Sequence, residues 1–346
     1  TEEVIKNMRA FLDENPETHV ITLFPNDGMG FCECDVCKAL DEPEWATVEE
    51  VNRHGRAVGL RGYGTLSRRM VIFNNAVARA LYETHPSAVV KVGAYSSYTS
   101  PPKDRSLVHF KSVIVQICHS WCHNHAICDT NCEINAEFKR AIEGWSRITP
   151  GGVMLYEYYY KVAQCELPFP ILHAIRQDLP YFKSIGVKGV YTHYTSNWGT
   201  LTLPYYIPSR LLWNCEADVD QLVMEFCEKF YGPAAEPMKR YYQRLEGAAI
   251  ASGLHFSPPY YRFPEVFTDQ CLDDCRHCLG RFVCRGYAGR TRCGRRGIVS
   301  NVRGRFLAWL VQRDLSLGRF FGIQRCQCPG NVWRLASRDG HSRCLW

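Results

Sequence analysis

The sequence predicts an α/β fold, a partial (β/α)8 TIM-type barrel made of about the last five strands and followed by C-terminal helices. Five short apolar runs alternate with segments that have helical periodicity. Polar and aromatic residues gather where each run ends, as they do around the active sites of α/β barrels. The alternative is an open, doubly wound sheet, which shares this alternation; no glycine-rich nucleotide-binding spacing follows any strand, which disfavours a nucleotide-binding version of it.

Each predicted strand is a buried apolar run bounded by turn residues. The five strands cover residues 19–24, 89–95, 113–117, 152–157 and 186–191. Helical spacing of apolar residues predicts helices over residues 1–12, 64–84, 135–148, 170–185, 201–213, 217–230 and 234–250. Pro180 is expected to kink or break its helix, because proline lacks the amide proton that a helix needs.

A closed barrel needs eight strands, so up to three are expected upstream of Thr1. The chain opens inside an amphipathic helix without an initiator methionine, which suggests a fragment. With the N-terminus absent, the sequence makes no prediction of localisation. No run of 18 uncharged apolar residues occurs, so no membrane span is predicted.

The formal net charge of +6 is unevenly distributed. Residues 266–346 hold fifteen Arg and five Asp with no Lys or Glu, giving 15 − 5 = +10, and the first 265 residues carry 26 − 30 = −4. The mildly acidic main part has no electrostatic footprint for nucleic acid. We therefore expect a domain over residues 1–255 and a Cys/Arg-rich tail over residues 256–346.

The composition of the tail is unusual for a globular chain. Its cysteine spacings do not form the paired Cys-x2-Cys blocks of a typical zinc site. We favour a reading-frame shift near Val266–Cys271, so that the tail is not a native domain, over a metal- or nucleic-acid-binding module. No function is assigned to it.

Glu157 is the first candidate for a catalytic group. It ends the apolar strand that begins at Gly152 and stands among tyrosines. A carboxylate at the end of a buried strand is costly unless it has partners or a task. A second carboxylate, Asp27, lies in the glycine-rich loop that follows the first strand.

Several motifs together resemble domain of unknown function 4838, a family that overlaps glycoside hydrolase family 163. The main one is Asn26-Asp-Gly-x-Gly-Phe-Cys-x-Cys-x2-Cys37, and shorter matches continue to about residue 255. The resemblance implies a barrel with endo-β-N-acetylglucosaminidase activity on N-glycans, and makes a secreted or periplasmic location plausible. Many relatives carry a glutamate where this chain has Thr192-His193.

Glycoside hydrolysis usually needs two carboxyl groups that flank the scissile bond. If the five strands are the last five of eight, Asp27 follows strand four and Glu157 follows strand seven, where many retaining barrel glycosidases place their acid/base and nucleophile. An N-acetyl substrate can instead supply its own amide oxygen as the nucleophile. We predict that Glu157 and Asp27 are catalytic.

Aromatic rings stack on the apolar faces of sugars, and polar side chains bind their hydroxyl groups. The predicted substrate-binding residues are the aromatic and polar side chains at the strand ends. They are Asn26, Tyr95, His119, Trp121, Tyr156, Tyr158, His193, Asn197 and Trp198.

The cysteines leave three possibilities open: a structural metal, disulfides or free thiols. Cys32, Cys34 and Cys37 offer three thiolates for a structural zinc, with a fourth ligand from the Cys/His-rich segment 118–132. Two other functions also stay open: a zinc-dependent hydrolase that uses these clusters, and a carbohydrate-binding barrel without catalysis. The favoured prediction is a glycoside hydrolase that needs no cofactor and has a glycan as its partner.

Overall fold

The structure is a computed structural model of the 346-residue chain. It describes residues 1–26, 30–42, 66–119, 122–159, 168–192, 198–255 and 263–286, together with three short strands near the C-terminus. Side chains are described throughout these ranges except at residues 198–200, 263, 279–286 and in the three terminal strands.

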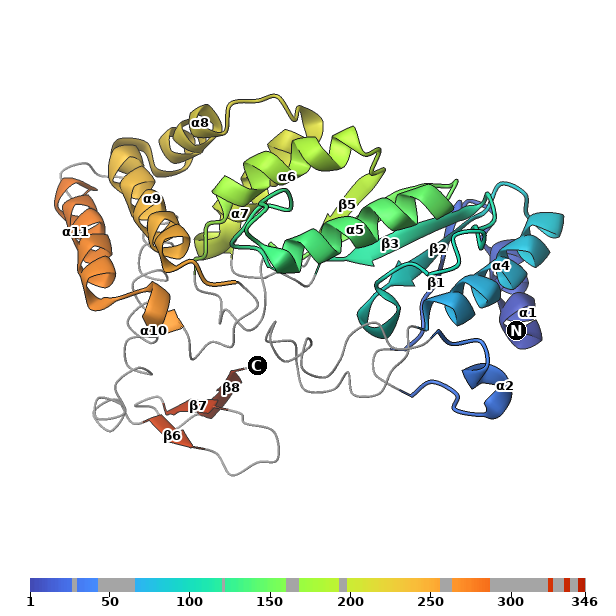
Figure 1. Ribbon diagram of the computed structural model, residues 1–346. Helices are drawn as coiled ribbons and strands as arrows, with labels where there is room; N and C mark the ends of the chain where they lie inside the picture. The colour runs from blue at the N-terminus through green and yellow to red at the C-terminus, as the bar shows by residue number, and fades with distance from the viewer. Residues whose placement is uncertain are drawn as a thin grey trace.

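The centre of the fold is a five-stranded sheet in which every neighbouring pair is parallel (Figure 1). Its strands are β1 (Val20–Leu23), β2 (Val89–Ala94), β3 (Val113–Cys118), β4 (Val153–Glu157) and β5 (Gly189–Thr192). Their order in space is β1-β2-β3-β4-β5, the same as in the sequence. A doubly wound sheet reverses its order at a switch point, whereas this sheet continues in one direction and curls into a half-barrel. The predicted fold class is confirmed.

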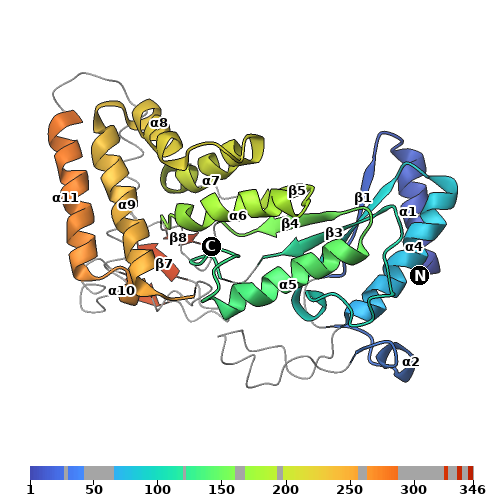
Figure 2. The ribbon, with the colours of Figure 1, turned by 45° about the horizontal axis from the view of Figure 1, so that its top comes forward.

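Seven of the helices correspond to the predicted ones. They are α1 (Glu2–Glu14), α4 (Ser67–Thr84), α5 (Glu133–Ile148), α6 (Leu172–Ser184), α7 (Trp198–Trp213), α8 (Val219–Tyr231) and α9 (Ala235–Ser252). A short helix, α2 (Asp35–Lys38), and two 3-10 turns, η1 (Ser96–Tyr98) and η3 (Gly232–Ala234), were not predicted. Figures 1 and 2 show α4, α5 and α6 along one side of the sheet.

Helix α6 continues through Pro180 to Ser184, so the proline does not break it, and the predicted kink stays a prediction. Leu179 and Phe182 on either side of the proline are 3% and 2% exposed. Their burial holds this turn against the core and offsets the backbone hydrogen bond that proline cannot make.

The two faces of the sheet differ in character, since successive residues of a strand point to opposite sides. One face carries apolar side chains that are fully buried under the helices, for example Val115 and Ile117 on β3 and Leu155 on β4. We call it the helix face. The ring of His119, just after β3, stacks on Phe138 of α5 with centroids 4.3 Å apart, which places His119 on the same side. The opposite face carries most of the tyrosines described below.

Helices α8 and α9 pack beyond the β5 edge, and α11 (Asp269–Gly286) lies beside α9, preceded by α10 (Phe263–Val266) (Figures 1 and 2). Cys271 and Cys275 of α11 are buried in the same hydrophobic core as the barrel, and Arg244 Nε donates to Asp274 Oδ2 at 2.8 Å. The first part of the tail therefore packs with the barrel helices. The domain boundary at 255 and the frame shift stay predictions.

The three short C-terminal strands form an antiparallel sheet in the order β6-β7-β8. They are β6 (Ile323–Arg325), β7 (Trp333–Ala336) and β8 (Ser342–Leu345). Across the described ranges, no helix is both long enough and apolar enough to cross a bilayer.

Candidate functional site

A row of tyrosines crosses the face of the sheet opposite the helices, at the carboxyl ends of its strands. Cys118 of β3 pairs in register with Tyr156 of β4, which pairs with Tyr191 of β5. The ring centroids of Tyr156 and Tyr191 are 5.0 Å apart, as are those of Tyr156 and Tyr158. Tyr95, which follows β2, continues the row, because one further step of the β2–β3 register places it beside Cys118. We call Tyr95, Tyr156, Tyr158 and Tyr191 the tyrosine row.

Two members of the tyrosine row, Tyr156 and Tyr158, have raised pKa values. Burial, with further contributions from Cys118 and Tyr95, raises the pKa of Tyr158. Burial and the neighbouring Tyr191 raise the pKa of Tyr156. Tyr191 is 56% exposed, so the row meets solvent at the β5 end. Neutral hydroxyl groups on exposed rings can donate and accept hydrogen bonds while the ring faces stack.

Glu157 lies on the other side of the sheet, in a buried polar cluster on the helix face. Its side chain is 2% exposed, and both of its carboxylate oxygens lie 3.0 Å from His119 Nδ1. His123 Nε2 lies 3.2 Å from Oε2. We call Glu157, His119 and His123 the Glu-His cluster. It is the alternation of side chains along β4 that separates Glu157 from Tyr156 and Tyr158.

His119 and His123 stabilise the negative charge of Glu157. Burial by itself would raise the pKa of this carboxyl, but the electrostatic attraction and hydrogen bonds of His119 and His123 outweigh it and lower the pKa to about 2. Asp178 of α6 accepts a hydrogen bond from the backbone amide of Ile127 at 2.7 Å, yet burial and the nearby Glu157 charge raise its pKa well above the ordinary value. The pKa values of Glu157 and Asp178 are thus shifted in opposite directions.

The structure brings only some of the predicted site residues together. Tyr95, Tyr156 and Tyr158 share the tyrosine row, and Asn26 is exposed at the carboxyl end of β1. His119 points into the helix face with 1% exposure, and its predicted contact with substrate stays a prediction. It lies there because residue 119 continues the β3 alternation of Val115 and Ile117.

The side chains of the other predicted site residues are not among those that the structure describes. Asp27, Trp121, His193 and Asn197 lie outside the described residues, and the side chain of Trp198, the first residue of α7, is not described. The catalytic roles of Glu157 and Asp27 stay predictions.

Two members of these groups were not among the predicted site residues. Tyr191 joins the tyrosine row through strand register, which single-strand patterns do not reveal. His123 was noted only as part of a cysteine- and histidine-rich segment. A spacing of four from His119 would place both side chains on one face only in a helix, and the described residues between β3 and α5 form no helix, so the spacing gave no signal.

Three groups of side chains place ligand atoms close enough for a metal ion among the described residues. Two of them are the Glu-His cluster and Cys32 with Cys34 and Cys37. The fourth ligand expected for these three cysteines from segment 118–132 is not beside them. Instead, Cys122 and Cys132 of that segment gather in the third group with His125 and His255. No disulfide joins the cysteines that the structure describes.

The Glu-His cluster is closed, with His119 and Glu157 each 1% exposed and His123 5% exposed. A catalytic zinc keeps one position open for water. The geometry therefore gives the zinc-hydrolase alternative no accessible metal position at this cluster.

Together these features define a parallel α/β half-barrel with a row of tyrosines at the carboxyl edge of its sheet and a buried, ionised glutamate on the opposite face. A family model described as Domain of unknown function (DUF4838) matches residues 1–244, and the chain belongs to this family. No curated protein matches the chain. No solved structure matches it either.

Proposed function

We propose that this protein is a glycoside hydrolase that acts on glycans containing β-linked N-acetylglucosamine, and that the tyrosine row binds the sugar. The observation that carries the proposal is the register that aligns Tyr156 and Tyr191 at the carboxyl edge of a curled parallel sheet. In α/β barrels this edge is where substrates bind. The resemblance to glycoside hydrolase family 163 supplies the substrate class.

The tyrosine row suits a carbohydrate better than a charged ligand. Its rings offer apolar faces for stacking, and the pKa values of Tyr156 and Tyr158 are raised, which keeps these two hydroxyl groups uncharged. The described part of this face has few formal charges: Lys91 lies there with its Nζ 5.9 Å from the ring centre of Phe24. A neutral, hydroxyl-rich ligand such as a glycan matches this surface.

In the proposed mechanism, Asp27 and Glu157 are the two carboxyl groups. The lowered pKa suits Glu157 to the ionised role of nucleophile or base and leaves the acid role to Asp27. Because Glu157 lies on the helix face, this role requires its carboxylate to turn toward the tyrosine row when substrate binds. That requirement makes Glu157 the most informative residue to replace.

The position of Glu157 also favours a second candidate function. If the carboxylate stays with His119 and His123, where it makes its hydrogen bonds, it positions the loop after β3 and does not contact a sugar. The barrel would then bind glycans without cleaving them. This candidate agrees with Thr192-His193, where many relatives carry a glutamate.

The test is incubation of the full chain with N-glycoproteins and amino-sugar oligosaccharides, followed by mass spectrometry of released glycan and by calorimetry of binding. The variants are Tyr191→Ala, Glu157→Gln and Asp27→Asn, each checked by circular dichroism to be folded at the assay temperature. Phe11→Ala is the matched control, since Phe11 is an aromatic residue 46% exposed on α1, away from the tyrosine row.

We expect glycan release by the wild type and by Phe11→Ala. Tyr191→Ala should bind about fivefold more weakly, since a stacked ring contributes about 1 kcal/mol and 1.4 kcal/mol is tenfold in affinity. Loss of release in both carboxylate variants supports the hydrolase with Glu157 at its centre. If Glu157→Gln still releases glycan and Asp27→Asn does not, Glu157 is a positioning residue. Binding of glycan by the wild type without release supports the second candidate. Absence of both binding and release would overturn the proposal.

A further inference from the structure

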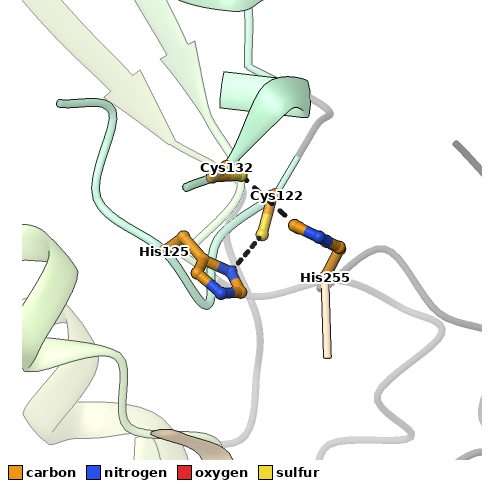
Figure 3. Close-up of side chains that lie close together, drawn as sticks. All are labelled: Cys122, His125, Cys132 and His255. Carbon is orange, nitrogen blue, oxygen red and sulfur yellow. Dashed lines mark hydrogen bonds between the residues drawn. The ribbon is translucent and has the colours of Figure 1, made fainter. Parts of the chain in front are cut away.

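Four side chains from segments far apart in the sequence converge beside the barrel (Figure 3). They are Cys122, His125 and Cys132, from the connection between β3 and α5, and His255, which follows α9. We call them the Cys2His2 cluster. Cys122 Sγ lies 3.1 Å from His125 Nδ1, and Cys132 Sγ lies 3.4 Å from His255 Nδ1. All four ligand atoms lie within 4.8 Å of one another.

This spacing is close to that of a tetrahedral zinc site. With Zn–S bonds of about 2.3 Å and Zn–N bonds of about 2.0–2.1 Å, neighbouring ligand atoms of a tetrahedron lie roughly 3.3–3.8 Å apart. The two closest sulfur–nitrogen pairs of the cluster are within a few tenths of an ångström of that range. A hydrogen-bonded contact between two side chains needs no third and fourth partner, whereas a metal ion explains why four ligand atoms meet at one point.

The backbone around the cluster is held in place by side chains outside it. Asn135 of α5 donates from Nδ2 to the carbonyl oxygens of Cys122 and His125 at 2.9 Å and 2.7 Å. The Sγ of Cys132, which caps the N-terminus of α5, accepts a hydrogen bond from the Asn135 amide at 3.4 Å. These bonds fix the loop that carries three of the four ligands, as a preorganised metal site requires.

A second set of contacts brings the fourth ligand to this loop. Asn124 donates from Nδ2 to the carbonyl oxygens of Ala249 and Leu254, at 2.8 Å and 2.9 Å. These two bonds tie the end of α9, and with it His255, to the residues between Cys122 and His125. The rings of His125 and His255 lie with their centroids 4.7 Å apart.

We propose that the Cys2His2 cluster binds one zinc ion that is structural in role. Two thiolates and two imidazoles are a ligand set that suits zinc. With four protein ligands the coordination shell is complete, so no position is left for water or substrate. The ion would link the β3–α5 connection to a residue 123 positions further along the chain than Cys132, and would hold His123 over Glu157. The proposal is independent of the glycan-binding function.

The experiment measures zinc in the full chain, purified under reducing conditions from zinc-supplemented medium and dialysed, by elemental mass spectrometry. The variants are Cys132→Ser and His255→Gln. The matched control is Cys128→Ser, in the same connection, whose exposed sulfur lies near Lys139 Nζ and not in the cluster. His255 is exposed at the end of a helix, so its replacement tests the ligand without disturbing the core.

We expect each ligand variant to hold one zinc ion fewer than the wild type, and Cys128→Ser to match the wild type. Counting this difference separates the site from any zinc held by Cys32, Cys34 and Cys37. Cobalt(II) added to metal-free protein should give the visible absorption of a tetrahedral thiolate site, and the affinity of His255→Gln for it should fall at least tenfold. Equal zinc content in wild type and both variants, or recovery of Cys122 and Cys132 as a disulfide, would overturn the proposal.

Discussion

Replacing Glu157 with glutamine should destabilise the protein strongly. The glutamine side chain has nearly the same shape, but its amide keeps one acceptor oxygen and turns an NH2 donor toward the histidines. The native carboxylate receives contacts from His119 at 3.0 Å and His123 at 3.2 Å while almost fully buried. Removing one partner of a buried charge cluster costs about 3–5 kcal/mol.

The lowered pKa of Glu157, which arises from the same two histidines, leads to a cost of similar size. A fall from 4.5 to about 2 corresponds to roughly 3 kcal/mol at about 1.4 kcal/mol per pH unit. In a folded domain of this size 1 kcal/mol moves the melting temperature by about 2–4 °C, so Glu157→Gln should melt roughly 6–12 °C below the wild type at pH 7.

The sign of the pH dependence follows from the direction of the shift. Because the pKa of Glu157 is lower in the folded than in the unfolded chain, its contribution is complete above the unfolded value and is lost as pH falls toward about 2. The gap between wild type and Glu157→Gln should therefore narrow by about 1 kcal/mol between pH 7 and pH 4.

The assay is urea unfolding at both pH values, followed by circular dichroism. Glu225→Gln is the control, since Glu225 forms surface ion pairs with Arg210 and Lys229, which contribute about 0–1 kcal/mol. A cost below 1 kcal/mol for Glu157→Gln, or a gap that stays constant with pH, would refute the reasoning.

Two further predictions concern the region around β3. His109 is 3% exposed, lies 3.0 Å from Thr149 Oγ1 through Nδ1, and has a pKa lowered to about 4 by burial. Between pH 7 and pH 5 the free energy of unfolding should therefore fall by about 2 kcal/mol more in the wild type than in His109→Gln. Urea unfolding at both pH values that gives the same fall for the two proteins would contradict this. A Cβ at Gly151 would lie 2.0 Å from the carbonyl oxygen of Val113, so Gly151→Ala should cost about 3 kcal/mol in thermal unfolding. The control is Gly247→Ala, which places a methyl group in open space within α9 and should raise the free energy of unfolding by about 0.5–1 kcal/mol. Equal effects of Gly151→Ala and Gly247→Ala would refute the steric argument.

Most of the fold could be read from the sequence. The five strands were visible as short apolar runs bounded by turn residues, and the seven helices through the period of 3.6 that burial imposes on them. The helix predicted over residues 170–185 is present, but that it continues through Pro180 depends on the packing of Leu179 and Phe182, which offsets a lost hydrogen bond and is a tertiary effect. The strand order, which separates a barrel from a doubly wound sheet, depends on pairing between distant segments.

The candidate site was predictable in part. Alternation along β4 already implied that Glu157 and Tyr156 point to opposite sides of the sheet. It did not indicate which side the helices cover, since both sides include apolar and aromatic residues.

The sequence by itself thus determined the local elements, the class of the fold and the gathering of tyrosines at strand ends. These properties depend on residue spacing within a single element. Only the tertiary structure decided that Tyr191 aligns with Tyr156, that His119 turns to Glu157, and that His255 reaches Cys132. Each of these contacts depends on how separate elements pack against one another, and the spacing of residues along the chain carries no record of that packing.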